Sequence, residues 1–354
     1  MATTTARATH VVTKIIDGDG HIYERDEDII PYLQGKYPED TLRTYYLFPT
    51  LDGWRRGLPP RGHRYDAAGW SQFMDDTGIS EAVLYPTLGL AFAYARDPDW
   101  AADLARAYND YVYDYFLRRN ARLKAVALLP VQAPRAAAAE LRRAINELGM
   151  VGGLLPTPGL TVGYGDPGFD PLYEAAQALG TMLAVHGAAR QHGIGVNLDY
   201  VGADGGQAFV LAHSFGQMSQ FTHMIFARVF ERFPRLKVAF LEAGCGWVPY
   251  LIERIDRRTE RSGRRLATEQ VQNHPVYFHA ELAERQVLPL ALDVVGEDRL
   301  LYASDFPHEP DDEIKEVLEA FLAREDVSPS AKQKILCENI EALYTLKAAQ
   351  TMAQ

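Results

Sequence analysis

Short apolar runs alternate along this chain with longer segments that have helical spacing. The eight runs, rich in β-branched and other apolar residues, lie at residues 11–17, 79–86, 123–130, 150–156, 181–186, 236–242, 275–280 and 299–305. Amphipathic segments lie between them, as at residues 99–118, 133–148 and 312–324. Apolar strands that alternate with helices are typical of a parallel sheet covered on both faces. Eight repeats in this length predict an α/β fold, a closed (β/α)8 TIM barrel.

A doubly wound open sheet is the structural alternative. It does not explain why polar residues collect at the C-terminal ends of the predicted strands. Residues 1–354 contain no tandem repeat, no low-complexity tract and no linker that would mark a domain boundary. We therefore expect a single barrel domain with a helical C-terminal end.

Two connections are longer than an ordinary loop between a strand and a helix. The first, about residues 22–65, has the length of a lid or a binding loop, and the second covers about residues 187–205. Residues of the first could form an aromatic wall and a cation that bind a planar acid: Trp54 and Arg55, with Tyr45, Tyr46, Phe48 and Arg56. In the alternative interpretation, Trp54 and Phe48 pack the loop onto the barrel and the arginines face water.

Composition and charge exclude several classes of protein. With 47% hydrophobic residues among 354, the chain is globular. Its net charge of −11 argues against binding to nucleic acid or to an anionic membrane, because the field of the protein repels phosphate. Cys245 and Cys337 are too few for a disulfide framework, and the N-terminal residues lack an apolar signal segment. We expect a cytoplasmic protein that acts on a small molecule.

Candidate metal ligands stand at the ends of three predicted strands. Asp19 and His21 follow the first strand, His186 ends the fifth and Asp305 ends the eighth. Because the C-terminal ends of barrel strands converge on one mouth, these side chains are expected to share a site. Two imidazoles and two carboxylates suit one divalent ion, with zinc as the first expectation and manganese or iron as alternatives.

Each of these elements also has a purely structural interpretation. The DGDG segment at residues 17–20 is more often a turn, and His186 could be a hydrogen-bonded core residue. The SDFPH segment at residues 304–308 could cap a helix. Each structural interpretation is reasonable for one strand end. It is much less probable that three independent strand ends all offer ligands by coincidence.

The motifs around these residues resemble a known family. Four segments carry the resemblance: Asp19-x-His21, HGA at His186, ERFPRLKVAFLEAGCGWVPYLIERID at residues 231–256 and LLYASDFPH at residues 300–308. They are similar to the amidohydrolase-related family (amidohydrolase family 2), which includes aminocarboxymuconate semialdehyde decarboxylase. The resemblance runs from about residue 13 to about residue 345. It implies a metal-dependent barrel in which Asp19, His21, His186 and Asp305 hold one ion.

The chain departs from the pattern of this family at three places. Many relatives have His-x-His or Glu-x-His where this chain has Asp19-x-His21. The decarboxylases of the family typically carry a histidine at the end of the sixth strand, where this chain has Glu242. The lysine ligand that two-metal relatives carry on the fourth strand is missing from GGLLPTPG at residues 152–159. One metal ion is therefore expected.

Two reactions fit such a site. In hydrolysis, the ion activates a water molecule whose proton Asp305 accepts, and a carbonyl-derived bond such as an amide or lactone breaks. In non-oxidative decarboxylation, Asp305 or Glu242 delivers a proton to a carbon atom of an aromatic or unsaturated acid. Glu242 in place of histidine favours hydrolysis of a small cyclic or aromatic compound. A metal-free barrel that serves for binding or as a scaffold is the third alternative, and the complete ligand set argues against it.

Two further histidines and one apolar segment complete the prediction. His213, near the start of a helix, is a candidate for substrate binding, with a place on the helix surface as the alternative. His279, at the end of the seventh strand, is a second candidate, with a hydrogen bond to a loop carbonyl as the alternative. The segment FTHMIFARVF at residues 221–230 is either a homodimer seam or part of the core.

Overall fold

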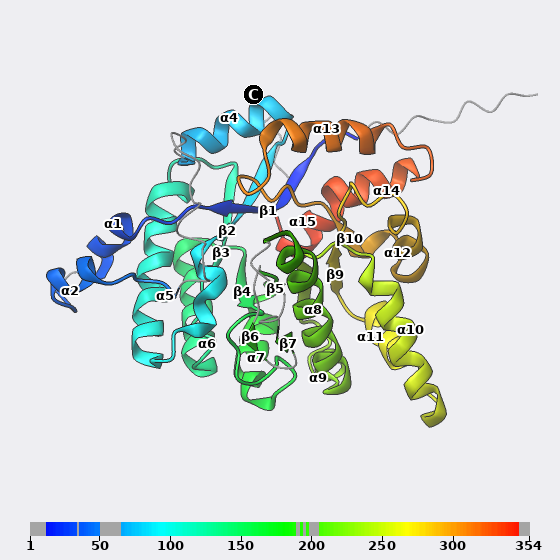
Figure 1. Ribbon diagram of the computed structural model, residues 1–354, viewed down its shortest axis with the longest axis horizontal. Helices are drawn as coiled ribbons and strands as arrows, with labels where there is room; N and C mark the ends of the chain where they lie inside the picture. The colour runs from blue at the N-terminus through cyan, green and yellow to red at the C-terminus, as the bar shows by residue number, and fades with distance from the viewer. Residues whose placement is uncertain are drawn as a thin grey trace, which may run out of the picture.

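Eight parallel strands form one sheet at the centre of the molecule (Figure 1). The computed structural model describes residues 12–33, 35–49, 65–188, 192–193, 196–197 and 205–346. The strands follow the order of the chain: β1 (Ile16–Ile22), β2 (Glu81–Pro86), β3 (Leu123–Ala127), β4 (Gly152–Pro156), β5 (Met182–His186), β8 (Lys237–Leu241), β9 (Val276–His279) and β10 (Leu300–Leu301).

Backbone hydrogen bonds join the two edges of this sheet. The Gly18 amide donates to the Tyr302 carbonyl (3.1 Å), and the Asp305 amide donates to the Asp19 carbonyl (3.0 Å). These bonds connect β1 with the segment that follows β10, so the sheet closes almost completely. The predicted TIM barrel is confirmed, and the open-sheet alternative is wrong.

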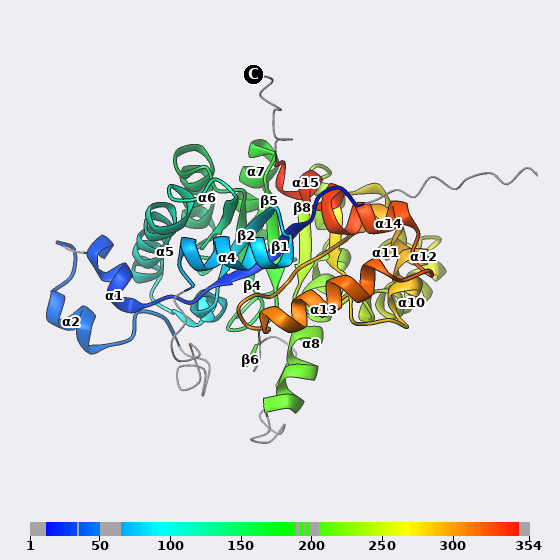
Figure 2. The ribbon, with the colours of Figure 1, turned by 90° about the horizontal axis from the view of Figure 1, so that it is seen from above.

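Helices surround the barrel on its outer side, and most of them follow a strand in the chain (Figures 1 and 2). They are α1 (Asp26–Ile29), α2 (Glu39–Thr44), α4 (Ala67–Thr77), α5 (Pro98–Val112), α6 (Pro134–Leu148), α7 (Asp170–Leu179), α8 (Gly205–Phe226), α9 (Val229–Arg232), α10 (Trp247–Thr259), α11 (Leu266–Asn273), α12 (Leu288–Val295), α13 (Asp311–Leu322), α14 (Pro329–Gln333) and α15 (Asn339–Tyr344).

Local sequence explains where these helices begin and end. The Asp66 side chain accepts hydrogen bonds from two amides of the first turn of α4, and left-handed Gly78 follows its last residue. α6 begins at Pro134 and ends before left-handed Gly149. α5 is shorter than the predicted segment 99–118, because the chain changes to a wider helical turn over Tyr113–Leu117.

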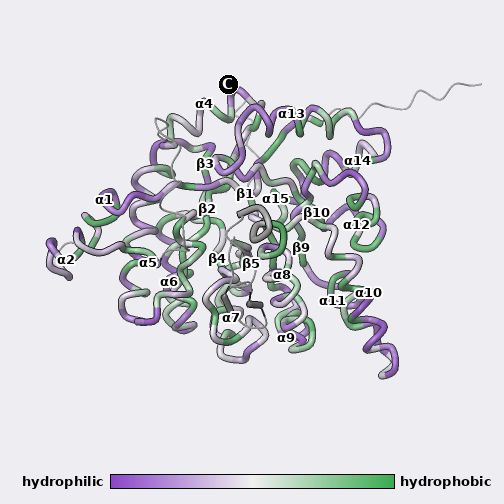
Figure 3. Tube along the Cα trace, viewed as in Figure 1, coloured by the Kyte–Doolittle hydropathy of each residue, from purple (hydrophilic) through white to green (hydrophobic). Residues whose placement is uncertain are grey.

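Aromatic side chains fill the layer between the sheet and α8. The Phe221 ring lies 5.4 Å from that of Phe240 on β8, which stacks at 5.7 Å on Phe278 of β9. All three residues are buried, and the hydropathy trace in Figure 3 is most hydrophilic at outer parts such as the far end of α10. Burial of this continuous apolar surface stabilises the barrel and holds the strand ends in place.

The first strand lies further along the chain than predicted. β1 spans Ile16–Ile22, whereas the expectation was residues 11–17, so Asp19 and His21 are inside the strand. The glycines make this possible: a Cβ atom on Gly18 would lie 2.7 Å from the Tyr302 carbonyl oxygen, and one on Gly20 would lie 2.2 Å from the Trp70 ring. The interpretation of DGDG as a turn is therefore wrong.

The described part of the first excursion forms α1 and α2, at one side of the barrel (Figures 1 and 2). Phe48 is buried with its ring 6.1 Å from that of Tyr108 on α5, so it packs the excursion onto the barrel rather than lining a site. Tyr45 and Tyr46 are exposed. Trp54, Arg55 and Arg56 lie outside the described residues, and their predicted roles stay predictions. In the second excursion, β6 (His192–Gly193) pairs with β7 (Val196–Asn197).

The segment at residues 221–230 faces the core. Phe221, Met224, Ile225, Val229 and Phe230 are buried, which confirms the core alternative for this segment and leaves a homodimer as an untested prediction. None of the helices in the described ranges has both the length and the apolar character that crossing a membrane requires.

Candidate metal centre and active site

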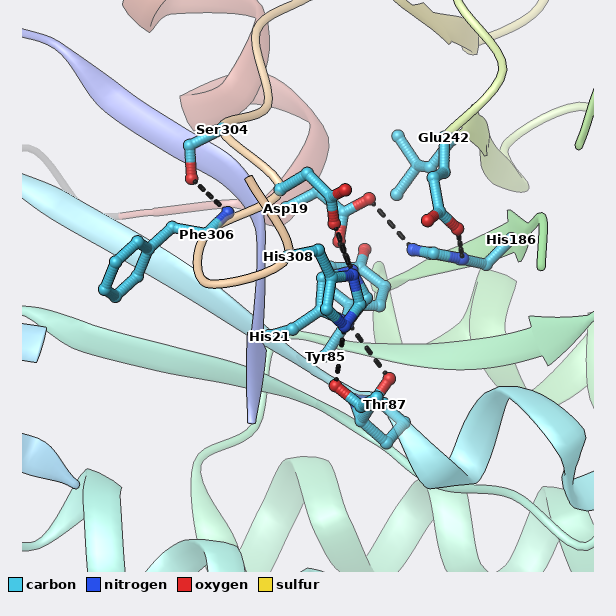
Figure 4. A network of polar contacts seen from close by, with 12 residues as sticks. Asp19, His21, Tyr85, Thr87, His186, Glu242, Ser304, Phe306 and His308 are labelled. Carbon is cyan, nitrogen blue, oxygen red and sulfur yellow. Dashed lines mark hydrogen bonds and ion pairs between the residues drawn. The ribbon is translucent and has the colours of Figure 1, made fainter. Parts of the chain in front are cut away.

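β1 and β5 bring three buried side chains to one point at the mouth of the barrel (Figure 4). One ligand atom from each of Asp19, His21 and His186 lies within 4.8 Å of the others. His186 Nε2 is 3.0 Å from Asp19 Oδ2, and His21 Nε2 is 3.6 Å from Asp19 Oδ1. The structure thus brings together three of the four predicted ligands from two strands that are far apart in sequence.

Backbone carbonyls set the orientation of both imidazoles. His21 Nδ1 donates to the Pro86 carbonyl (3.1 Å), and His186 Nδ1 donates to the Gly187 carbonyl (2.8 Å). With Nδ1 as the donor, the Nε2 atom of each ring carries a lone pair, which points toward Asp19 and, for His21, also toward Asp305. His21 Nε2, His186 Nε2 and Asp19 Oδ1 are buried and have no hydrogen-bond partner among the described residues.

This arrangement fits a bound cation. Lone pairs of nitrogen and carboxylate oxygen repel one another at these distances unless a proton or a metal ion lies between them. Burial lowers the pKa of His186, but Asp19 and Glu242 outweigh it and raise the pKa well above its ordinary value, so the site favours positive charge at this point. A divalent ion would take the place of a proton and neutralise the buried carboxylates.

Asp305 belongs to a second, overlapping group with His21, Glu242 and His308. Asp305 Oδ1 lies 3.2 Å from His21 Nε2 and 2.7 Å from His308 Nδ1. Burial raises the pKa of Asp305, but His308 and His21 outweigh it and hold the pKa far below its ordinary value. Asp305 is therefore ionised and lies beside His21, the residue that its group shares with Asp19 and His186.

His308 is a site residue that the sequence-based prediction missed. Its Nε2 is 2.9 Å from Thr87 Oγ1, and its ring stacks on that of His21 with centroids 4.1 Å apart. Burial lowers the pKa of His308, but Asp305 outweighs it and raises the pKa. The available signal was its place three residues after Asp305 in the SDFPH segment.

Glu242 contacts a candidate ligand rather than standing free. Its Oε2 is 3.1 Å from His186 Nδ1, and its Oε1 is 3.9 Å from His213 Nε2. Burial raises the pKa of Glu242, but His213 and His186 outweigh it and lower the pKa. Glu242 and Asp305 both adopt left-handed backbone conformations, with φ of 57° and 56°. Such conformations are strained in residues other than glycine and concentrate at functional sites.

Asp17 ties the first strand to the loop that carries Asp305. It accepts hydrogen bonds from the Ser304 amide (2.9 Å) and hydroxyl (2.5 Å), and Ser304 Oγ accepts one from the Phe306 amide (3.0 Å). Burial raises the pKa of Asp17 to about 7, although Ser304 acts to lower it. The two strand ends that supply ligands are thus held together by buried hydrogen bonds.

A cavity of about 410 Å³ adjoins this centre, and Glu242 and Asp305 form part of its wall. His213 and His279 also line it, and both are buried, so each of these predicted residues reaches the mouth. The helix-surface alternative for His213 is therefore wrong. No hydrogen bond joins His279 to a carbonyl among the described residues, so the loop-carbonyl alternative has no support.

Comparison with known proteins agrees with the motifs. The sequence matches the amidohydrolase family over residues 16–346. A 2-amino-3-carboxymuconate-6-semialdehyde decarboxylase of Dictyostelium discoideum is 26% identical over 249 residues, which cover 66% of this chain and 64% of that protein, just under two thirds of its length. A gamma-resorcylate decarboxylase of Polaromonas sp. is 27% identical over 292 residues, which cover 78% of this chain and 86% of that protein.

Solved structures share the fold. A dihydroxybenzoic acid decarboxylase from Polaromonas sp., with bound manganese and the inhibitor 2-nitroresorcinol, has a TM-score of 0.70 at 21% identity and covers 96% of this chain and 99% of that chain. A 5-carboxyvanillate decarboxylase from Novosphingobium aromaticivorans, also with bound manganese, has a TM-score of 0.71 at 21% identity and covers 94% of this chain and 97% of that chain. Both agree with the TIM barrel.

Proposed function

The chain belongs to the amidohydrolase family and is an enzyme, and we propose that it is a metal-dependent, non-oxidative decarboxylase of a small aromatic or unsaturated carboxylic acid. The observation that carries this proposal is the combination of decarboxylase relatives with a buried ligand set directed at one point. Hydrolysis, which the sequence favours, becomes the alternative reaction.

The position of Glu242 weakens the main argument for hydrolysis. That argument rested on Glu242 in place of the histidine of decarboxylating relatives. Glu242 lines the cavity, but its Oε2 also lies 3.1 Å from His186 Nδ1, so it acts on a candidate metal ligand. A carboxylate behind a ligand histidine orients the ring and raises its basicity, which is compatible with either reaction.

Asp19, His21, His186 and Asp305 would hold one divalent ion. These oxygen and nitrogen ligands suit manganese, zinc or iron, and the manganese in the two related structures makes manganese the first ion to test, ahead of the zinc expected from sequence. When bound, the ion supplies Lewis-acid chemistry that orients the carboxyl group of the substrate. Glu242 would reinforce the tautomer of His186 that presents Nε2, which the Gly187 carbonyl already sets.

The pair formed by Asp305 and His308 is suited to supply the proton that the reaction requires. In decarboxylation a proton adds to the carbon that bears the carboxyl group, and the bond to that group then breaks to release carbon dioxide. His308 Nδ1 donates to Asp305 Oδ1 across 2.7 Å, and Asp305 forms part of the wall of the cavity. Asp305 would deliver this proton, and His308 would hold it in reserve and position the carboxylate.

The test is a comparison of substrates on protein loaded separately with manganese, zinc and iron. We expect metal-dependent release of carbon dioxide from hydroxybenzoates or unsaturated acids, and its loss when a chelator removes the ion. His186→Ala should lose metal and activity, whereas His274→Ala, a histidine outside the site, should keep both. Hydrolysis of esters, lactones or amides without any release of carbon dioxide would refute the proposal. If the protein binds no ion and converts none of the acids, esters, lactones or amides, the scaffold alternative is supported.

A further inference from the structure

The cavity beside the metal centre has an acidic wall that the proposed reaction does not use. In addition to Glu242 and Asp305, four carboxylates line it: Glu281, Glu284, Glu309 and Glu313. Neither Lys nor Arg occurs among the described residues that line this cavity. The field inside it is therefore negative, and an anionic group placed there would be repelled.

Two buried polar side chains line the same cavity and have no hydrogen-bond partner among the described residues. His279 is 5% exposed, and neither of its ring nitrogens has a hydrogen-bond partner among the described residues. Tyr302 is 2% exposed, and its hydroxyl also lacks a partner there. Buried polar groups are normally hydrogen-bonded, so unpartnered groups at a cavity wall indicate a place for ligand atoms.

Glu284 offers a third such atom. The backbone amides of Cys245 and Gly246, just before the first residue of α10, lower the pKa of the Glu284 carboxylate. Its Oε2 is nevertheless buried and has no hydrogen-bond partner among the described residues. Burial and Glu281 raise the pKa of Glu284, and His279, which lines the same cavity, opposes them. The amides at the start of α10 therefore leave one oxygen of this carboxylate, Oε2, available to a ligand.

Apolar side chains complete the cavity. Leu282, Ile314 and Val317 line it together with the polar groups. A volume of about 410 Å³ is near the lower end for small-molecule pockets and suits a compound of one ring. A ring between these apolar groups could reach Asp305 at one end and the acidic wall at the other.

We propose that His279, Tyr302 and Glu284 bind the end of the substrate that lies away from the reacting carboxyl group, and that this end carries a hydrogen-bond donor, an amino or hydroxyl group, rather than a second carboxylate. The inference rests on the proposed decarboxylase function, because it places the reacting carboxyl group at the metal centre. Glu284 accepts a hydrogen bond from the donor, and Tyr302 donates to its lone pair. His279 accepts the second hydrogen of an amino group, or donates to the second lone pair of a hydroxyl group.

Binding of substrate analogues tests this proposal without measuring turnover. The probes are 2-hydroxybenzoates that carry an amino, hydroxyl, methyl or carboxylate group at ring position 4, titrated into the manganese-loaded enzyme by calorimetry. We expect the amino and hydroxyl compounds to bind roughly tenfold more tightly than the methyl compound. The dicarboxylate should bind roughly tenfold more weakly than the methyl compound.

Three variants assign the selectivity to this wall. Glu281→Gln, Glu284→Gln and His279→Gln should each reduce the preference for the amino compound over the dicarboxylate severalfold while manganese content and thermal melting stay unchanged. Glu319→Gln is the matched control, because Glu319 is an exposed residue of α13 that does not line the cavity.

The outcomes separate this inference from the proposed function. Equal or tighter binding of the dicarboxylate to the wild-type enzyme, binding of none of the four compounds, or selectivity that all three variants leave unchanged would each overturn the inference. Release of carbon dioxide is measured separately: acids that react without any preference for a donor would refute the inference alone. Donor selectivity without release of carbon dioxide from any acid would refute the proposed function alone.

Discussion

Replacement of Glu242 by glutamine tests how this chain holds its metal ion. The substitution keeps the size of the side chain and removes its charge. Glu242 Oε2 lies 3.1 Å from His186 Nδ1; His186 is buried and the Glu242 side chain is only 11% exposed, so water screens the interaction weakly. If the carboxylate polarises His186 toward the metal, the affinity for the ion must fall.

The structure limits how large this fall can be. Loss of an outer partner of a ligand histidine weakens metal binding about 10- to 100-fold. His186 Nδ1 also has the Gly187 carbonyl at 2.8 Å, so the tautomer survives the substitution. We therefore expect the lower end of the range, about tenfold in the dissociation constant of manganese, or about 1.4 kcal/mol.

The assay is competition between the protein and a fluorescent manganese chelator at fixed pH. Glu313→Gln serves as the control, because Glu313 lines the outer part of the same cavity and no contact joins it to a candidate ligand in the described part of the chain. An unchanged dissociation constant for Glu242→Gln would refute the role of Glu242 behind His186. A loss as complete as that of His186→Ala would make Glu242 a direct ligand and would equally refute the reasoning.

Three other substitutions probe proton transfer and buried charge. Asp305→Asn should lower kcat about 100- to 10,000-fold, because an amide cannot carry the proton; near-normal kcat with full metal content would remove Asp305 from that step. His308→Gln should lower kcat roughly tenfold and alter the pH profile of kcat/KM with the ion still bound; an unaltered profile would reduce His308 to a packing role. Burial raises the pKa of Glu24 from 4.5 to about 7, although backbone amides of residues 87–89 oppose it. The folded chain then keeps a proton that the unfolded chain releases between these values, so the free energy of unfolding falls as the pH rises through this window. In chemical denaturation, the free energy of unfolding of Glu24→Gln should rise relative to that of the wild type by up to about 3 kcal/mol as the pH increases across this window. A difference that does not depend on pH would show that Glu24 is already ionised.

Local pattern was sufficient for the architecture of the barrel. Seven of the eight predicted runs contain a whole strand, because a parallel strand covered on both faces must be apolar along its whole length, and the run at residues 11–17 overlaps β1 only at Ile16 and Asp17. The exception is instructive: β1 continues through Asp17 and Asp19, which no rule of local hydrophobicity predicts. These side chains are stabilised by partners from the other end of the chain, such as Ser304, which is 287 residues away from Asp17.

The candidate ligands could also be named from the sequence, since Asp19, His21, His186 and Asp305 lie in or just beyond the C-terminal halves of their strands and barrel geometry directs these ends to one mouth. What each of the other polar residues contacts was decided only by the tertiary structure. The direction in which Glu242 points, the stacking of His308 on His21 and the unpartnered state of His279 depend on distances between different strand ends. Periodicity along the chain records which face of an element is buried, but it holds no information on which buried groups meet, because those contacts arise only when the barrel closes.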